Sequence, residues 1–153
     1  MAVLVYAWKA TAEDAPTLAR LRWQWRTEER DELGVDRATF VSFFTTWVVD
    51  NLATHVPFLV EVDGRHAGMA WLMLGQRVPS PHNFSRRTGD VQSVYVVPDL
   101  RNAGVGAALL AAILDHARDL ELTRVTVHSA ERAVPFYLRG GFTDDTTWLE
   151  LEL

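Results

Sequence analysis

The sequence predicts an α/β fold in which helices and strands share one mixed sheet. A strand-like run at 91–97 is followed, after a glycine-containing turn, by a run at 107–120 whose apolar residues recur at three- and four-residue steps. Two further strand-like runs, at 58–62 and 67–74, are joined by a short Asp-Gly turn typical of a tight hairpin. Strands and helices thus alternate along the chain, and the absence of repeats or linkers indicates one domain over 1–153.

The N-terminal third predicts one strand and two helices. Residues 3–8 alternate well enough for a first strand. Thr11, with Asp14 three residues later, resembles a capping box and predicts a helix start. Asp36 can cap a second helix, which is rich in apolar residues and extends to Leu52.

The central unit of the sequence is a strand, a turn and a helix. Pro98 ends the strand because proline cannot donate to a sheet ladder. Gly104 and Gly106 let the backbone turn tightly and leave room for another group to approach the main chain. The helix, expected from Ala107, presents unpaired N–H groups and the positive end of its dipole at this turn. The arrangement favours binding of a phosphate or pyrophosphate.

The elements around this unit are a loop, two strands and a helix. The polar, proline-containing loop at 76–89 is the candidate for a flexible lid on the acceptor side. A strand is expected at 124–128, a helix at 133–139 and a last strand at 146–153, where Trp148, Leu149 and Leu151 fit a strand.

Two motifs follow one another in the second half of the chain. The first is Val97-Pro98, Arg101, Gly104, Gly106 and Leu109, and the second is Ala133, Phe136-Tyr137 and Gly141-Phe142. They resemble the coenzyme A pyrophosphate loop and the Ala-x-x-Phe-Tyr helix ending in Gly-Phe of the GNAT superfamily of N-acetyltransferases. The resemblance implies a mixed, mostly antiparallel sheet flanked by helices, in which the central strand and the 124–128 strand run parallel and splay apart around acetyl-coenzyme A.

The resemblance also implies which residues bind the cofactor. The main chain of Val94, Tyr95 and Val96 would pair with the pantetheine arm, and the Val96 N–H would donate to the thioester oxygen. Phe136 belongs to the second motif and is expected at the cofactor. Arg101 would reinforce the anion site; alternatively, it pairs with Asp99. The pyrophosphate would bind the N–H groups of Asn102, Ala103, Gly104, Val105, Gly106 and Ala107.

The implied reaction is direct attack of an amine on the thioester, since the chain has no cysteine to carry the acetyl group. Tyr137 would donate a hydrogen bond or proton to the departing thiolate; the alternative is a core tyrosine. Asp90 matches the position on the central strand where members of the family often have a carboxylate base. A turn residue in Thr88-Gly89-Asp90 explains Asp90 at least as well. Gln92 cannot titrate, His128 and Glu131 are weaker candidates, and a water chain without a dedicated base is also compatible.

Composition limits the classes of partner. The net charge is −5 and basic residues are scattered, so nucleic acid is not an expected partner. The apolar start of the chain is too short to span a membrane, and we expect a soluble, cytoplasmic protein without a metal ion. A homodimer is expected only by analogy.

The acceptor is the least defined part of the prediction. Glu28, Glu29, Asp31 and Glu32 lie close in sequence to Trp23 and Trp25 and suggest a small cationic amine; a solvated helix face explains the same charges. The predicted function is therefore acetylation of a small primary amine. Peptide or protein N-termini are the nearest enzymatic alternative, and a non-catalytic acyl-coenzyme A sensor is the alternative from another class.

Overall fold

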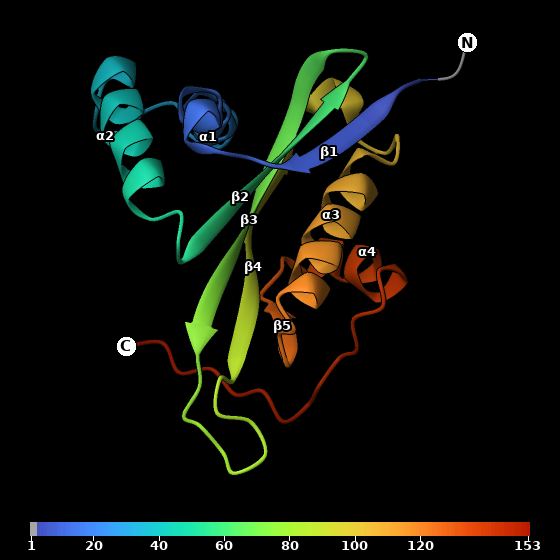
Figure 1. Ribbon diagram of the computed structural model, residues 1–153. Helices are drawn as coiled ribbons and strands as arrows, with labels where there is room; N and C mark the ends of the chain where they lie inside the picture. The colour runs from blue at the N-terminus through green and yellow to red at the C-terminus, as the bar shows by residue number, and fades with distance from the viewer. Residues whose placement is uncertain (1–2) are drawn as a thin grey trace.

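The computed structural model describes residues 3–153 and has one five-stranded sheet with strand order β1-β2-β3-β4-β5 (Figure 1). The first four strands are antiparallel to their neighbours, whereas β5 runs parallel to β4. The predicted mixed, mostly antiparallel sheet with one parallel pair is confirmed. The strands are β1 (Val5–Lys9), β2 (His55–Val62), β3 (Arg65–Gln76), β4 (Arg87–Val96) and β5 (Arg124–Val127).

Helices cover both faces of the sheet, with α1 and α2 on one side and α3 and α4 on the other (Figure 1). This explains why six consecutive residues of β3, 67–72, are buried instead of alternating between core and solvent. No helix within residues 3–153 is long and apolar enough to cross a membrane. The helices are α1 (Ala15–Glu29), α2 (Arg37–Asp50), α3 (Val105–Asp119) and α4 (Val134–Arg139).

Short polar contacts start the two N-terminal helices. The Asp36 carboxylate accepts hydrogen bonds from the N–H and hydroxyl of Thr39 at 2.9 and 2.7 Å, which confirms the predicted cap. These bonds lower the pKa of Asp36. At the first helix, Asp14 accepts from the Thr11 N–H at 2.9 Å, but residues 12–14 form a 3₁₀ turn and α1 begins at Ala15.

Three predicted boundaries around the central unit shift. β3 extends to Gln76 and β4 begins at Arg87, so the predicted loop at 76–89 contracts to 77–86. Asp90 consequently lies within a strand, and its interpretation as a turn residue is wrong. α3 begins two residues before the expected Ala107, because Gly104 already occupies the N-cap position.

The predicted last strand at 146–153 is wrong: these residues form no strand. Their alternating sequence has the period of a strand, but a strand also needs a neighbouring backbone to pair with. The side chain of Asp145 accepts from the N–H and hydroxyl of Thr147 at 2.9 and 2.7 Å, and the chain turns there. Figure 1 shows the segment running from α4 across the lower end of the sheet to a free end.

Candidate functional site

β4 and β5 separate halfway along β4. Their pairing runs from Thr88 opposite Arg124 to Val91 opposite Val127, and β4 then continues alone on that side to Val96. The register between β3 and β4 slips at the same place, where Ser93 has φ +54° and β4 contains one extra residue. The second half of β4 therefore has β3 on one side and an open edge on the other.

The open edge is formed by the main chain of Val94 and Val96. The Val97 N–H donates to the Ala67 carbonyl of β3 at 2.8 Å. Because main-chain groups of successive strand residues point to opposite sides, those of Val96 and Val94 point away from β3. Tyr95, between them, turns its side chain into the core and is 2% exposed.

The turn after β4 leaves the start of α3 uncovered. Asn102 and Gly104 have φ of +64° and +80°, and no side chain within residues 3–153 caps the helix. The first intrahelical bond runs from the Ala108 N–H to the Gly104 carbonyl at 3.1 Å, so the N–H groups of the preceding residues have no such partner. A Cβ added to Gly104 would meet nothing within 4 Å, which means that the space above the turn is open.

Gly106 lies where the three elements predicted to bind the cofactor meet: the open edge of β4, the start of α3, and α4. A Cβ placed on it would lie 3.4 Å from the Phe136 ring of α4 and 4.0 Å from a methyl group of Val96. The open edge, the start of α3 and α4 are thus brought together. Tyr137 follows on α4, with its ring between those of Phe136 and Phe142 at centroid distances of 5.0 and 5.5 Å. Burial raises the pKa of its hydroxyl.

Asp90 lies in the paired half of β4, opposite Thr126 of β5. Its carboxylate accepts hydrogen bonds from the Thr126 hydroxyl at 2.7 Å and from the Gln92 amide at 3.1 Å. His128 differs, since its side chain is 87% exposed and lies 3.4 Å from Glu150. Of these two candidate bases, Asp90 is held by hydrogen bonds within the strand pair, whereas His128 lies just after β5 with an exposed side chain.

A link between α1 and the turn is the part of the site that the sequence did not predict. Arg101 donates from Nε to the Val96 carbonyl at 2.9 Å and from its terminal nitrogen to Glu28 at 3.1 Å. Tyr95 donates its hydroxyl hydrogen bond to the same Glu28 carboxylate. Asp99 pairs instead with Arg65 at 2.7 Å, so the alternative pairing of Arg101 with Asp99 is wrong. No local sequence signal indicates a contact between residues 73 positions apart.

Aromatic and charged residues of α1 pack behind this link. Trp25 stacks on Tyr95 at 5.6 Å, and the Arg22 guanidinium lies 4.7 Å from the Trp25 ring centre. Burial lowers the pKa of Arg22. Glu29 pairs with Arg26 at 2.6 Å on the helix surface. Of the acidic run, Glu28 therefore joins the site and Glu29 joins a surface pair.

Comparison with known proteins agrees with this geometry. A sequence model of the acetyltransferase (GNAT) family matches residues 15–142. A curated glucosamine 6-phosphate N-acetyltransferase from Trypanosoma brucei brucei is 31% identical over 96 residues, a match that covers 63% of this chain and 63% of the relative's length.

Solved structures show the same fold. A predicted acetyltransferase from Clostridium acetobutylicum, crystallised with acetyl-CoA, superposes with a TM-score of 0.76 at 22% identity, covering 97% of this chain and 96% of that one. Glucosamine-6-phosphate N-acetyltransferase from Arabidopsis thaliana gives 0.72 at 16% identity, covering 97% and 98%. With the splayed strand pair, the uncapped helix start and the family match over most of its length, the chain belongs to the GNAT acetyltransferase family.

Proposed function

We propose that this protein is an acetyl-CoA-dependent N-acetyltransferase acting on a primary amine of a small molecule. The observation that carries the proposal is the meeting of Val96, Gly106 and Phe136. At that junction an unpaired strand edge adjoins a helix start that has open space above Gly104. An extended amide-containing arm and a pyrophosphate need these two groups of main-chain donors.

The chain's own residues fit the parts of acetyl-CoA. Val94 and Val96 would pair with the pantetheine amides, and the first-turn N–H groups of α3 would hold the pyrophosphate. Arg101, beside the turn, would add positive charge there. When bound, acetyl-CoA supplies the acetyl group as a thioester that an amine can attack without a covalent enzyme intermediate.

Three groups would assist the transfer. The Val96 N–H would donate to the thioester oxygen as negative charge develops on it. Asp90 would accept the proton that an ammonium group must lose, since a lysine-like amine, with a pKa of about 10.4, is mostly protonated at neutral pH. Tyr137 would hydrogen-bond the departing sulfur; its help is partial because a thiol, with a pKa of about 8.5, already leaves readily as thiolate.

Amino sugars and amino sugar phosphates are the first acceptors to examine. The Trypanosoma relative is named for acetylation of glucosamine 6-phosphate, a small amine. Within the present chain, Glu28 and Trp25 supply a carboxylate and an aromatic ring next to the β4 edge, and both are groups that attract cations.

Calorimetric titration with acetyl-CoA and with coenzyme A, followed by a thiol-release assay on the same preparation, tests the proposal. The acceptor panel contains amino sugars, amino sugar phosphates, polyamines and short peptides. Binding of acetyl-CoA with thiol release on one small-amine class is the expected result. Release with peptides alone would move the assignment to N-terminal acetylation, and binding without any release would favour a sensor. Absence of binding would overturn the assignment.

A further inference from the structure

Arg22 is a partly buried arginine of α1 that has no polar partner within its own chain. Four arginines in residues 3–153 are partly buried. Three of them donate hydrogen bonds: Arg26 to Glu29 at 2.6 Å, Arg86 to the Val78 carbonyl at 3.0 Å, and Arg87 to the Leu120 carbonyl at 3.3 Å. Within the same described residues, the Arg22 guanidinium makes no hydrogen bond and no ion pair. Its neighbour is the Trp25 ring, whose centre lies 4.7 Å away.

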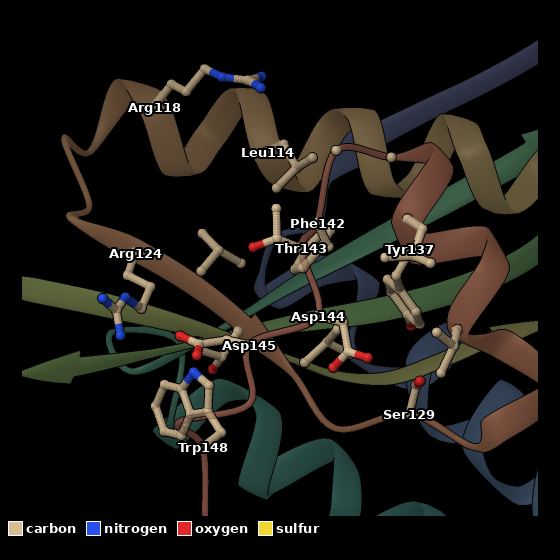
Figure 2. Close-up of a pocket in the computed structure, with 17 residues that line it drawn as sticks. Leu114, Arg118, Arg124, Ser129, Tyr137, Phe142, Thr143, Asp144, Asp145 and Trp148 are labelled. Carbon is tan, nitrogen blue, oxygen red and sulfur yellow. The ribbon is translucent and has the colours of Figure 1, made fainter.

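Arginines elsewhere on the molecule are exposed or lie beside carboxylates. Two of them line the groove of about 560 Å³ next to β5, where Figure 2 shows Arg118 pointing away from the other side chains and Arg124 near Asp145. Both arginines are exposed to water, and Arg118 also pairs with Asp115 at 3.2 Å. Arg22 is the partly buried arginine that lacks such a neighbour.

The surroundings of Arg22 carry positive charge. Burial and the charge of Arg26 both lower the pKa of Arg22, although an arginine keeps its proton at neutral pH. Glu29 is the carboxylate that acts in the opposite direction, but it already pairs with Arg26 at 2.6 Å. Charges that are withdrawn from water are normally paired in proteins, because an unpaired charge loses hydration without compensation. An anion from outside the chain would supply the counter-ion that Arg22 lacks.

The side chains of Asp90 and Tyr95 lie on one face of the sheet. Both are opposite residues of β3 that alternate along that strand, and alternate residues of a strand share a face. The pairs are Asp90 with Met73, Gln92 with Trp71, and Tyr95 with Met69. Helix α1 covers this face near Tyr95, whose ring stacks on Trp25 at 5.6 Å. Helix α2 covers it near Trp71, whose ring centre lies 5.8 Å from that of Phe44. Helix α1 thus borders the side of the sheet that carries the candidate base.

Three stacked groups connect Arg22 with this face. The guanidinium lies over Trp25, and the Trp25 ring is inclined by only 16° to the ring of Tyr95. Tyr95 belongs to the open half of β4, next to the Val96 N–H proposed to meet the thioester oxygen. The stack therefore leads from beside the proposed place of acetyl transfer to a guanidinium without a counter-ion.

On the basis of the acetyl transfer proposed above, we propose that Arg22 binds an anionic group of the acceptor, which is then a small amine that also carries a phosphate or a carboxylate. A guanidinium presents parallel N–H donors that match the oxygens of either group. The amine would lie toward Asp90 and the anionic group toward α1. Arg22 would select the acceptor and take no part in the chemical step.

Matched acceptors test this role in thiol-release assays. Glucosamine 6-phosphate is compared with glucosamine, and alanine with alaninamide, because the members of each pair differ in one anionic group. We expect the anionic member of one pair to have a KM lower by about tenfold or more, as for a hydrogen bond to a charged group. Arg22→Gln should raise that KM by the same factor, with little change in kcat or in the KM of the neutral member. Equal effects of Arg22→Gln on both members would overturn the proposal.

Two further variants separate binding of the anion from a structural role. Arg20→Gln is the matched control, since Arg20 is exposed on the same helix and donates to Thr17 at 3.1 Å. It should leave the KM of both members unchanged. Arg22→Lys keeps the charge without the planar fork, and should restore part of the affinity for the anionic member. A loss in Arg22→Lys that equals the loss in Arg22→Gln for anionic and neutral acceptors alike would assign Arg22 to packing.

Binding of the anion can also be measured without turnover. Coenzyme A is added first, so that its own phosphates fill the anion site at the start of α3. The complex is then titrated calorimetrically with glucose 6-phosphate and with propionate, which lack the amine and cannot be acetylated. We expect one of them to bind the wild-type protein and to lose about tenfold in affinity in Arg22→Gln. Binding of neither anion, or binding that Arg22→Gln leaves unchanged, would overturn the role of Arg22. Absence of thiol release with every amine would instead contradict the proposed function.

Discussion

The two halves of β4 differ in what lies beside them. Residues 88–91 have β3 on one side and β5 on the other, whereas Val94 to Val96 have β3 alone. Side-chain hydrogen bonds from Thr126 and Gln92 fix Asp90 in the first half. In the second half the main chain itself is the exposed group. One strand thus holds a side chain in place at one end and offers backbone donors at the other, and the slip at Ser93 separates the two roles.

Removing a main-chain donor from the open half should have the largest effect. Val96→Pro eliminates the N–H proposed to face the thioester oxygen, and loss of one such donor costs about 10²–10³-fold in kcat. Proline is tolerated at a strand edge, so the fold should persist. Val96→Ala keeps the N–H and should retain most activity in steady-state thiol-release assays. Equal rates in the two variants would remove Val96 from the mechanism.

The turn that follows the open half should be the next most sensitive. Gly104 has φ +80°, where a β-branched residue is strained by about 1–2 kcal/mol, and its side chain would project over the helix start. We expect Gly104→Val to weaken acetyl-CoA binding more than tenfold by calorimetry. Gly34→Val is the control, since Gly34 has φ +76° and open space but lies outside the site. Equal affinities of Gly104→Val and Gly34→Val for acetyl-CoA would contradict an anion site at the start of α3. Gly106→Val should also weaken binding, through its contact with Phe136.

The tyrosine on α4 should contribute about tenfold, below the 10²–10⁴-fold typical of acid catalysis, because a thiol already leaves readily as thiolate. Because burial raises the pKa of Tyr137 above its usual value of about 10, the hydroxyl keeps its proton from about pH 6 to pH 9. Tyr137→Phe should therefore lower kcat by the same factor throughout this range. A loss that grows or vanishes with pH would show that Tyr137 is not the acid.

Asp90, in the half of β4 that pairs with β5, should affect how kcat/KM depends on pH. Asp90→Asn keeps a partner for the Thr126 hydroxyl but cannot accept a proton, so the rise of kcat/KM with pH should become shallower. Asp50→Asn, at the exposed end of α2, is the control for removing one negative charge. An unchanged pH profile in Asp90→Asn would show that water, and not Asp90, accepts the proton of the acceptor ammonium.

The link from α1 should have the smallest effect. The Arg101–Glu28 pair is half exposed, and such pairs contribute at most about 1 kcal/mol. Glu28→Gln removes the negative charge that neutralises Arg101 beside the anion site, so it should lower the dissociation constant for acetyl-CoA a few-fold at low salt, with less change at high salt. Glu29→Gln, one residue away and paired with Arg26, should leave it unchanged. If Glu28→Gln and Glu29→Gln give the same dissociation constant for acetyl-CoA, Glu28 does not influence the turn through Arg101.

The sequence predicted those features that a few adjacent residues determine. The Asp36 cap, the Asp-Gly hairpin and the glycine turn before α3 were all predicted, because a few adjacent residues determine them. The contact of Glu28 with Arg101 joins α1 to the turn before α3, 73 residues away in sequence, and had no such signal. The last predicted strand failed for the opposite reason: residues 148–153 have the pattern, but the pattern does not supply a partner edge.

The extra residue at Ser93 also limits how this protein can vary. Deleting one residue between Gln92 and Tyr95 would leave two steps on each strand between the Trp71–Gln92 pair and the Met69–Tyr95 pair, which is a regular ladder without the slip. Tyr95 would keep its partner and its face, but β4 would lose the bend and the added twist that an extra residue gives a strand. Point substitutions along this edge can adjust the site gradually, whereas a single deletion would straighten β4 at the place where it leaves β5.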